Sequence, residues 1–383
     1  MKKIALKQLF TLGAIALASG FACAQTSSVQ LYGIVDAAVR HTNNEGATGD
    51  KSVTKMLGGG MSQSRWGINV TEDLGGGLKA IANLENRVNI DDGSVSTPFF
   101  QQSWVGLQGG FGRLTMGRQY NMLFDLVTST YASFPYSPYM DAYKPEIGMS
   151  MGARASNMLK YTAELGAWRA SLQYSFDEGN KVTASTTPAA VPGIVGGATK
   201  TAGGYVRYAA SGLAAGAGFL RTTLPGGTDV DAWTLGGSYR TGPWYLNAGY
   251  ALNKRDSYSV NPLAAAASQG LLNAYWTGSS NGGFSAGDAD KRQMFKVGMG
   301  YQITPQLNAG VHYYHAKQSG SASGNFNGKA NFVVAVADYA FSKRTDAYFG
   351  VDHTRVSGGT SMNLDANGAR NRTGITAGLR HRF

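Results

Sequence analysis

Apolar and polar residues alternate along most of this chain, with the period of two that sends them to opposite faces of a β-strand. In the segment 168–176, Trp, Ala, Leu, Tyr and Phe share one face, while Arg, Ser, Gln and Ser share the other. The segments 244–252 and 295–303 repeat this pattern. Aromatic residues gather near the ends of the apolar faces, as they do at membrane–water interfaces. The pattern predicts strands with one face in an apolar environment.

The alternation predicts sixteen strands. They span 29–40, 64–73, 78–86, 101–109, 113–118, 154–163, 167–177, 203–210, 213–221, 231–240, 243–254, 292–303, 306–317, 329–341, 344–356 and 373–383. Short turns with Gly or Pro alternate with long polar connections at 41–63, 87–100, 119–153, 178–202, 255–291 and 357–372. Short periplasmic turns and long extracellular loops are typical of outer-membrane barrels. The expected fold is an all-β, sixteen-stranded antiparallel transmembrane barrel.

Two other architectures were weighed against the barrel. Residues 25–383 contain no run of about 18 apolar residues, so they offer no transmembrane helix. A soluble β-sandwich or lectin also has alternating strands, but it usually exposes charged residues on its outer face. Here the apolar faces repeat through almost the entire chain. A closed barrel, which pairs every backbone group without water, fits this best.

The N-terminus has the features of an export signal. Three lysines in the first seven residues precede an apolar stretch at 9–18 and an Ala-Cys-Ala pattern at 22–24. This organisation predicts a signal peptide over 1–24 and one barrel domain over 25–383. Lipidation at Cys23 is the alternative, although the residues just before it fit that pattern poorly. Cys23 is the single cysteine, so the mature chain would form no disulfide.

Composition narrows the class of protein further. Charged residues make up 15% of the chain, against about 25% in soluble domains, and the 53 glycines are about twice the usual share. Removing the three lysines of the signal peptide lowers the formal net charge from +11 to +8. A basic soluble protein would suggest a nucleic-acid partner. Export from the cytoplasm excludes that partner here.

Several motifs resemble a known family. They are Val29-Gln-Leu-Tyr-Gly-Ile-Val-Asp36, Ser64-Arg-Trp-Gly-Ile-Asn-Val-Thr-Glu-Asp-Leu-Gly-Gly-Gly-Leu78, Trp104-Val-Gly-Leu107, Phe111-Gly-Arg-Leu-Thr-Met-Gly-Arg-Gln119, Asp338-Tyr-Ala-Phe-Ser-Lys-Arg-Thr345 and Gly378-Leu-Arg-His-Arg-Phe383. In this order, they resemble the Gram-negative general diffusion porins, in the form common among β-proteobacteria. The resemblance implies a homotrimer in the outer membrane with one pore per subunit. It also implies that the third long connection, 119–153, folds inward and narrows the pore.

The resemblance further implies a constriction built from opposed charges. The residues that match the basic wall are Arg65, Arg118 and Arg154, and the candidate carboxylates on the inward loop are Asp125, Asp141 and Glu146. These three carboxylates could equally be solvated loop charges. The loop itself departs from the acidic stretch of some enteric relatives, because it reads Phe-Pro-Tyr-Ser-Pro-Tyr at 134–139.

Strand parity gives an independent check on the arginines. Arg65 and Arg154 alternate with apolar neighbours that should face lipid, so both should point into the lumen. Arg118 shares parity with apolar residues instead, and its inward position rests on the resemblance, with Gly117 as a possible break in the alternation. Further residues expected inside are the bases Lys160, Arg169, Arg207 and Lys296 and the acids Asp36, Glu85, Asp338 and Asp352.

The expected function follows from these charges. A wall with more positive than negative charge predicts a water-filled channel for passive diffusion of small hydrophilic solutes and ions, with mild anion preference. The expected partners are a second and third copy of the chain, outer-membrane lipid and lipopolysaccharide, and the barrel-assembly machinery. The resemblance implies that the machinery recognises the terminal aromatic residue, Phe383. A simple interfacial anchor would occupy the same position.

Other functions were considered on the same residues. An enzyme would need a nucleophile or an acid–base set, but the sequence has no Gly-x-Ser-x-Gly or His-Glu-x-x-His motif. His312 and His315 are three residues apart and should lie on opposite faces of a strand. No cofactor or metal is therefore expected. A solute-specific channel or a surface adhesin on the same barrel stays open as the alternative, with the connection 255–291 as its binding segment.

Overall fold

The fold is described from a computed structural model, for residues 27–45, 52–133, 145–177, 200–223, 229–256, 288–364 and 367–383. The predicted signal peptide 1–24, Cys23 and Asp141 lie outside the described residues. So does most of the connection 255–291.

Strands dominate the chain. They are β1 (Ser28–Thr42), β2 (Val53–Leu57), β3 (Arg65–Gly75), β4 (Leu78–Val88), β5 (Val95–Gly109), β6 (Gly112–Tyr120), β7 (Arg154–Leu165), β8 (Trp168–Ser175), β9 (Lys200–Ala210), β10 (Leu213–Thr223), β11 (Asp229–Thr241), β12 (Trp244–Arg255), β13 (Lys291–Gln302), β14 (Leu307–Ser319), β15 (Gly328–Ala340), β16 (Thr345–Gly358) and β17 (Asn371–Arg382). Two short helices, α2 (Met122–Thr130) and α3 (Pro145–Met149), lie between β6 and β7.

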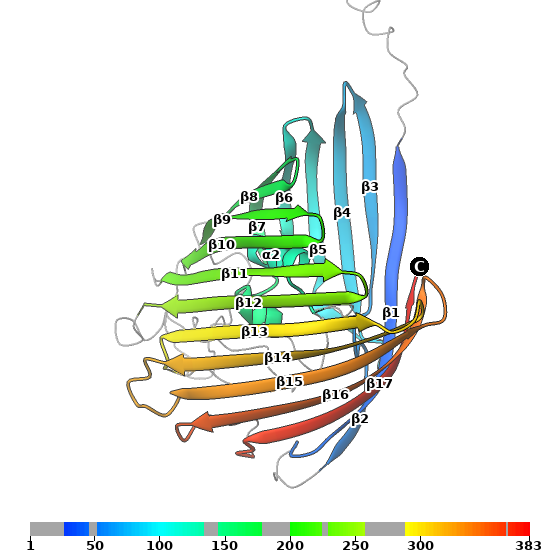
Figure 1. Ribbon diagram of the computed structural model, residues 1–383. Coiled ribbons are helices and arrows are strands. Elements are labelled where there is room, and N and C mark those ends of the chain that lie inside the picture. Colours follow the sequence, from blue (N-terminus) through cyan, green and yellow to red (C-terminus); the bar gives the residue numbers. More distant parts are fainter. Residues whose placement is uncertain are drawn as a thin grey trace, which may run out of the picture.

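The strands form one antiparallel sheet that closes on itself (Figure 1). From β3 to β17, each strand pairs with the next along the chain, and β1 pairs with both β3 and β17. The barrel therefore has the sixteen strands that the alternation predicted. β2 is additional: it pairs with β1 inside the predicted connection 41–63. The predicted connection 87–100 is also shorter than expected, because β5 begins at Val95.

The two ends of the barrel differ in their connections. One end, named here the short-turn end, carries tight reversals such as 76–77, 166–167 and 242–243, together with both chain ends of the barrel. The opposite end, named the long-connection end, carries 121–153, 256–290 and 359–370. This division follows the predicted alternation of short turns and long loops.

The outer face of the barrel is an apolar belt. Alternate residues such as Val105 and Leu172 expose 52% and 63% of their surface, although they are large and hydrophobic. Aromatic pairs mark the edges of the belt. At the short-turn end, Trp244 lies 4.5 Å from Tyr301, and at the other end a tilted pair of Phe219 and Trp233 lies 4.2 Å apart between ring centres. Lipid is the environment that makes such a surface stable. No helix among the described residues is long and apolar enough to span a membrane.

The barrel closes at a seam between the first and last strands. The amide of Phe383 donates to the carbonyl of Gly33 at 3.1 Å, and the amide of Gly33 donates back to Phe383 at 3.2 Å. The Phe383 ring covers Gly33 so closely that a Cβ there would lie 2.2 Å from it. The last residue of the chain is thus part of the closure itself.

Candidate functional site: the lumen and its arginine wall

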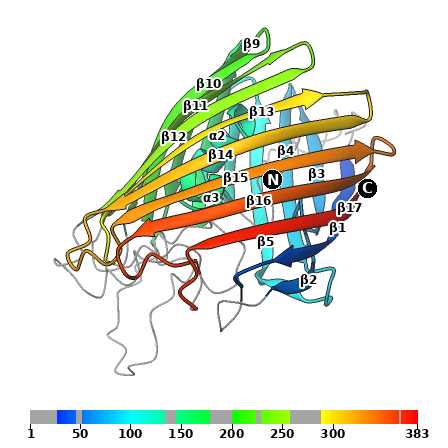
Figure 2. The same ribbon diagram turned by 60° about the horizontal axis from the view of Figure 1, so that its bottom comes forward.

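The described parts of the connection between β6 and β7 lie inside the barrel, on the side that the resemblance implied. Its helices α2 and α3 lie on the inner side of the sheet (Figures 1 and 2). α2 packs against β8–β11 and α3 against β12. The helices meet through Phe124 and Ile147, and Met122, Leu123 and Leu126 have no exposed surface. The apolar stretch of this loop is therefore a packing face.

Glycines on the inner wall make room for α2. Gly236 and Gly249 are cross-strand partners on β11 and β12, and the ring of Tyr131 lies over both. A Cβ at either glycine would come within 2.6 Å of that ring, which is closer than carbon atoms can approach. Three further inward glycines would contact other α2 side chains in the same way: Gly203, Gly216 and Gly218. We call these five the glycine bed. Part of the high glycine content thus serves to seat the loop.

The end of α2 is held by the wall through its backbone. A helix leaves its last carbonyls without intrahelical partners, and here they accept from four different strands. The side chain of Arg207 donates to the carbonyl of Ser129 at 2.9 Å, and that of Ser238 donates to the carbonyl of Thr130 at 2.5 Å. In the same way, Lys296 donates to the carbonyl of Tyr131 at 2.6 Å and Tyr245 donates to the carbonyl of Ala132 at 2.8 Å. Two of the donors are cations, which the negative end of a helix dipole favours. We call this set the carbonyl latch.

Glu146 on α3 is buried against the wall. Its carboxylate lies 2.5 Å from the Nζ of Lys296 and accepts from Ser133 at 2.7 Å and Tyr314 at 3.0 Å. Burial alone would raise the pKa of Glu146, but the charge of Lys296 and these hydrogen bonds outweigh it and hold the pKa below its usual value. With 2% of its surface exposed, Glu146 fastens the loop to the barrel.

Asp125 on α2 also finds a wall partner. Its carboxylate lies 2.7 Å from the Nζ of Lys160 on β7, and that ammonium also donates to the carbonyl of Tyr120. Asp125 keeps 30% of its side chain exposed, unlike Glu146. Of the two described acidic candidates, Asp125 is therefore the one that faces the open lumen.

The predicted basic residues gather on the other side of the lumen. Arg65 on β3 and Arg154 on β7 both approach the carboxylate of Glu85 on β4, at 3.5 and 3.2 Å. Arg154 also donates to the Tyr120 hydroxyl at 2.9 Å. Glu85 is 3% exposed, so it holds the two guanidinium groups in place from behind.

Arg118 joins this group through an irregularity in β6. The register with β7 shifts between Gly117 and Gln119, and Gly117 has a φ of +127°, which an L-residue rarely adopts. The bulge breaks the alternation. Arg118 donates to the hydroxyl of Ser156 at 2.8 Å, two residues along β7 from Arg154. This explains why simple parity pointed Arg118 the wrong way.

A fourth arginine belongs to the wall and was missed from the sequence. Arg87 is the direct cross-strand partner of Arg65, so their side chains lie on the same face. Arg87 is two residues from Glu85 on the same strand, so the two side chains share a face. Since Glu85 was expected inside, this parity could have identified Arg87. We call Arg65, Arg87, Arg118 and Arg154 the arginine wall.

The other charges predicted inside lie on the lumen side, each with a partner. These contacts are Arg169 with Glu164 at 2.7 Å, Asp352 with Arg40 at 2.6 Å, Asp338 with Arg380 at 3.7 Å, and Asp36 with the amides of Gly60, Met61 and Ser62. The two histidines separate as expected: His312 is buried against Asn247 in the lumen, whereas His315 contacts Asn331 on the outer face.

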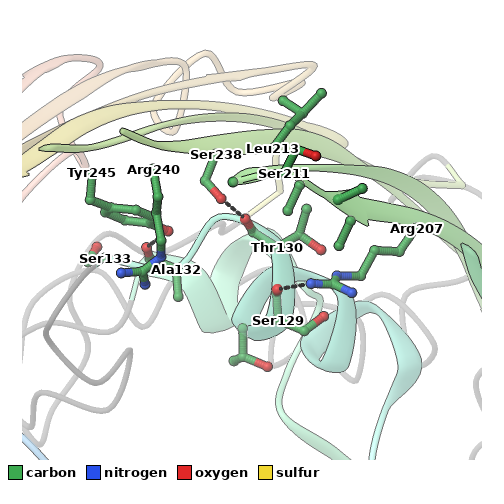
Figure 3. A pocket seen from close by; sticks show the side chains of 15 residues that line it. Ser129, Thr130, Ala132, Ser133, Arg207, Ser211, Leu213, Ser238, Arg240 and Tyr245 are labelled. Atoms are coloured by element: carbon green, nitrogen blue, oxygen red, sulfur yellow. Dashed lines mark hydrogen bonds between the residues drawn. The ribbon is translucent and has the colours of Figure 1, made fainter. Parts of the chain in front are cut away.

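A cavity of about 510 Å³ remains beside the carbonyl latch, toward the short-turn end (Figure 3). Its lining includes Arg207, Arg240 and Tyr245 from the wall and Ser129 and Ser133 from the loop. The guanidinium carbon of Arg240 lies 4.6 Å from the centre of the Tyr245 ring. The described parts of the loop thus lie inside the barrel and leave this space beside them open.

A closed barrel with an apolar outer belt, a charged lumen and an inward loop defines an outer-membrane pore. Comparison with known proteins agrees with this class. Residues 11–359 match the family model described as Gram-negative porin, and the chain belongs to this family. It is located in the cell outer membrane.

Individual relatives give the same result. The chain is 39% identical to outer membrane porin protein 32 of Delftia acidovorans over 246 residues, which cover 62% of this chain and 66% of that one. It is 29% identical to an outer membrane porin protein of Bordetella pertussis, over 80% of this chain and 94% of the relative. Among solved structures, the anion-selective porin from Comamonas acidovorans aligns with a TM-score of 0.69 and 27% identity, over 93% of this chain and all of that one.

Proposed function

We propose that this porin is a diffusion channel for small hydrophilic solutes and ions with a mild preference for anions. The observation that carries the proposal is the arginine wall: Arg65 and Arg154 share the carboxylate of Glu85, Arg87 lies opposite Arg65, and Arg118 donates to Ser156 two residues from Arg154. A net positive constriction attracts anions and repels cations. The likeness to the anion-selective porin from Comamonas acidovorans supports the same interpretation. Arg65, Arg118 and Arg154 are proposed as the basic side of the constriction, with Asp125 opposite.

Reversal potentials across a potassium chloride gradient in planar bilayers test the proposal. The wild-type channel should show a potential of the sign that anion flow produces. Arg118→Glu should move that potential toward cation selectivity, because it reverses one charge of the wall. Arg344→Glu, in the exposed reversal 341–344, makes the same charge change away from the lumen and should leave the potential almost unchanged. A cation-selective wild type would overturn the proposal.

We also propose the assembly that the resemblance implied: a homotrimer, inserted by the barrel-assembly machinery with Phe383 as its signal, after removal of residues 1–24. The exposed ring of Phe383 at the end of β17 is consistent with recognition by a partner. Deleting Phe383 should lower the amount of trimer in the outer membrane of cells. Normal trimer yield would count against the signal role. We propose no catalytic activity for the chain.

A further inference from the structure

One strand position of the barrel is interrupted by an insert. Beside β1, β2 ends opposite Ala38 and β3 begins opposite Ile34. Three residues of β1, 35–37, lie between these two pairs, whereas seven residues of the neighbouring chain, 58–64, lie between β2 and β3. β2 and β3 are therefore two parts of one strand position, and the residues between them exceed what the ladder can hold. We call residues 58–64 the strand insert.

The strand insert folds to the inner side of the barrel. All of its residues are buried. The amide of Met61 donates to the Tyr348 hydroxyl on β16 at 3.0 Å, and the guanidinium of Arg380 on β17 donates to the Ser62 hydroxyl at 2.7 Å. Tyr348 and Arg380 alternate with exposed residues of the apolar belt, so both point inward. The insert thus reaches across the seam on the lumen side.

Asp36 on β1 is the residue around which the insert folds. Its carboxylate accepts from the consecutive amides of Gly60, Met61 and Ser62, at 3.0, 3.2 and 2.6 Å. It also accepts from the Tyr348 hydroxyl at 2.5 Å. Consecutive amides that converge on one anion form a nest. All four partners donate, so the carboxylate is ionised. Asp36 has no exposed surface, and its contacts serve to hold the insert.

Ser64 fastens the end of the insert to β1 and to β4. Its hydroxyl accepts from the amide of Asp36 at 2.9 Å and donates to the carbonyl of Asp36 at 3.0 Å. Its own carbonyl accepts from the amide of Val88 at 3.2 Å. Ser64 and Val88 directly neighbour Arg65 and Arg87 in the sequence. The contacts that hold the insert therefore lead to two residues of the arginine wall.

These two arginines lie where regular strand pairing stops. Arg65 is the first residue of β3, and it forms the last pair of its ladders with both β1 and β4. On the other side of Arg87, the register between β4 and β5 shifts between Asn86 and Val88. Strand ends open more easily than strand centres, and like charges placed directly opposite each other destabilise a sheet. The ladders alone therefore support this pair of arginines weakly.

We propose that Asp36 is a positioning residue for the arginine wall and acts through the strand insert. By holding the insert and Ser64, it fixes the start of β3 and the end of β4, so that Arg65 and Arg87 stay together in the lumen. The charge selectivity of the channel then depends on a carboxylate that has no exposed surface itself. The inference rests on the anion preference proposed above and adds a residue that controls it.

Reversal potentials of the full mature barrel in planar bilayers separate this role from a simple effect of charge. Removing a negative charge from the lumen favours anions. Asp352→Asn is the matched control, because Asp352 is also inward and buried but is held by Arg40, not by the insert. It should shift the potential toward anions. Asp36→Asn should shift the potential the opposite way, toward cations, because the amide accepts through one oxygen only and releases the insert and the two arginines.

Ser64→Ala tests the same path without any change of charge. It removes both hydrogen bonds between the Ser64 side chain and the backbone of Asp36. The reversal potential should again shift toward cations, by less than in Asp36→Asn. Ser342→Ala is its control, because the Ser342 hydroxyl likewise accepts from two nearby amides, but in an exposed reversal at the short-turn end. It should leave the potential unchanged.

A shift toward anions in Asp36→Asn, like that of the Asp352 control, would overturn the positioning role. So would an unchanged potential in Ser64→Ala, even if urea titration showed a loss of stability, because the insert would then serve the fold alone. If Asp36→Asn does not fold, the Ser64→Ala result decides. A wild type without anion preference would reject the proposed function, whereas an anion-selective wild type whose preference survives in both variants rejects only the role of Asp36.

Discussion

The two sides of the lumen carry opposite kinds of side chain. On β9 to β12, most inward positions that face α2 are glycines, hydroxyls and small apolar groups, although Arg207 and Arg240 also point inward, and the loop docks there with its backbone carbonyls and aromatic ring against the wall. On β3, β4, β6 and β7, the inward positions include the four residues of the arginine wall, two of which are held by Glu85. The glycines allow the close approach of the loop, whereas the guanidinium groups on the other side project from the wall. The difference teaches that one side of the wall positions the loop, while the other side carries the arginines that we propose as the basic side of the constriction.

The largest effect is expected from Lys296→Met, which leaves Glu146 buried without its cation. Breaking one partner of a buried ion pair costs about 3–5 kcal/mol. The free energy of unfolding, from urea titration in lipid vesicles, should fall by that order, and open-channel current noise should rise as the loop loosens. The matched double variant Lys296→Met with Glu146→Leu should recover most of the loss. A single variant as stable as wild type would show that the pair does not hold the loop.

The same pair predicts a pH dependence. Because the pKa of Glu146 is lowered in the folded state, its contribution to stability is fully present above the ordinary value of 4.5 and is lost as the pH falls below it. Conductance and its noise should therefore stay constant between pH 7 and pH 5 and change only at lower pH. Glu146→Gln should remove the part of the acid response that this group causes. A transition centred above pH 5 that Glu146→Gln abolishes would contradict this assignment.

Tyr131→Ala should have the next largest effect. The substitution empties the space above Gly236 and Gly249 and removes the hydrogen bond to Thr234. We expect a loss of about 2–3 kcal/mol, somewhat below a buried aromatic truncation in a dry core, since water can enter the gap. Tyr131→Phe keeps the ring on the glycine bed and should lose no more than about 1 kcal/mol. Equal losses of stability in the two variants would mean that the hydroxyl group of Tyr131, and not the packing of its ring on the glycine bed, holds the loop.

Glu85→Gln tests the charge of the arginine wall, on the other side of the lumen. It removes a carboxylate that contacts both Arg65 and Arg154, so the arginine wall gains net positive charge. The reversal potential should shift toward stronger anion selectivity, by less than the reversal of charge in Arg118→Glu. Asp92→Asn, on the exposed connection 89–94, is the control and should not shift it. A shift toward cations would mean that the arginines do not face the permeating ions.

The smallest effect is expected from Asn121→Ala, at the start of α2. The Asn121 side chain accepts from the amide of Phe124 at 2.8 Å and donates to the carbonyl of Gly152 at 2.7 Å. Losing a helix N-cap costs about 1 kcal/mol. Asn121→Asp keeps the acceptor and should retain about half of that stability. Urea titration compares the three proteins, and no difference between Ala and wild type would show that the cap is dispensable.

The sixteen barrel strands could be predicted because lipid imposes one rule on every strand: an apolar residue at each outward position. β2 was not predicted, because Val53–Leu57 is short and pairs with β1 inside a segment that was expected to be a connection. Parity predicted the inward position of Arg65 and Arg154. It failed for Arg118, because the bulge at Gly117 breaks the alternation of the strand. The partner of Glu146 could not be found, because Lys296 lies on a strand far along the chain and the two meet only after the loop docks. Inward glycines on adjacent strands were the overlooked signal for the docking surface.

The reciprocal hydrogen bonds between Gly33 and Phe383 have a consequence for biogenesis. Because the first strand must pair with the last, a nascent or truncated chain presents two open sheet edges that would seek partners in other chains. The barrel can close only after β17 has been synthesised and has paired with β1. A chain that ends before β17 would therefore carry the hazard of edge-to-edge aggregation rather than form a smaller working pore.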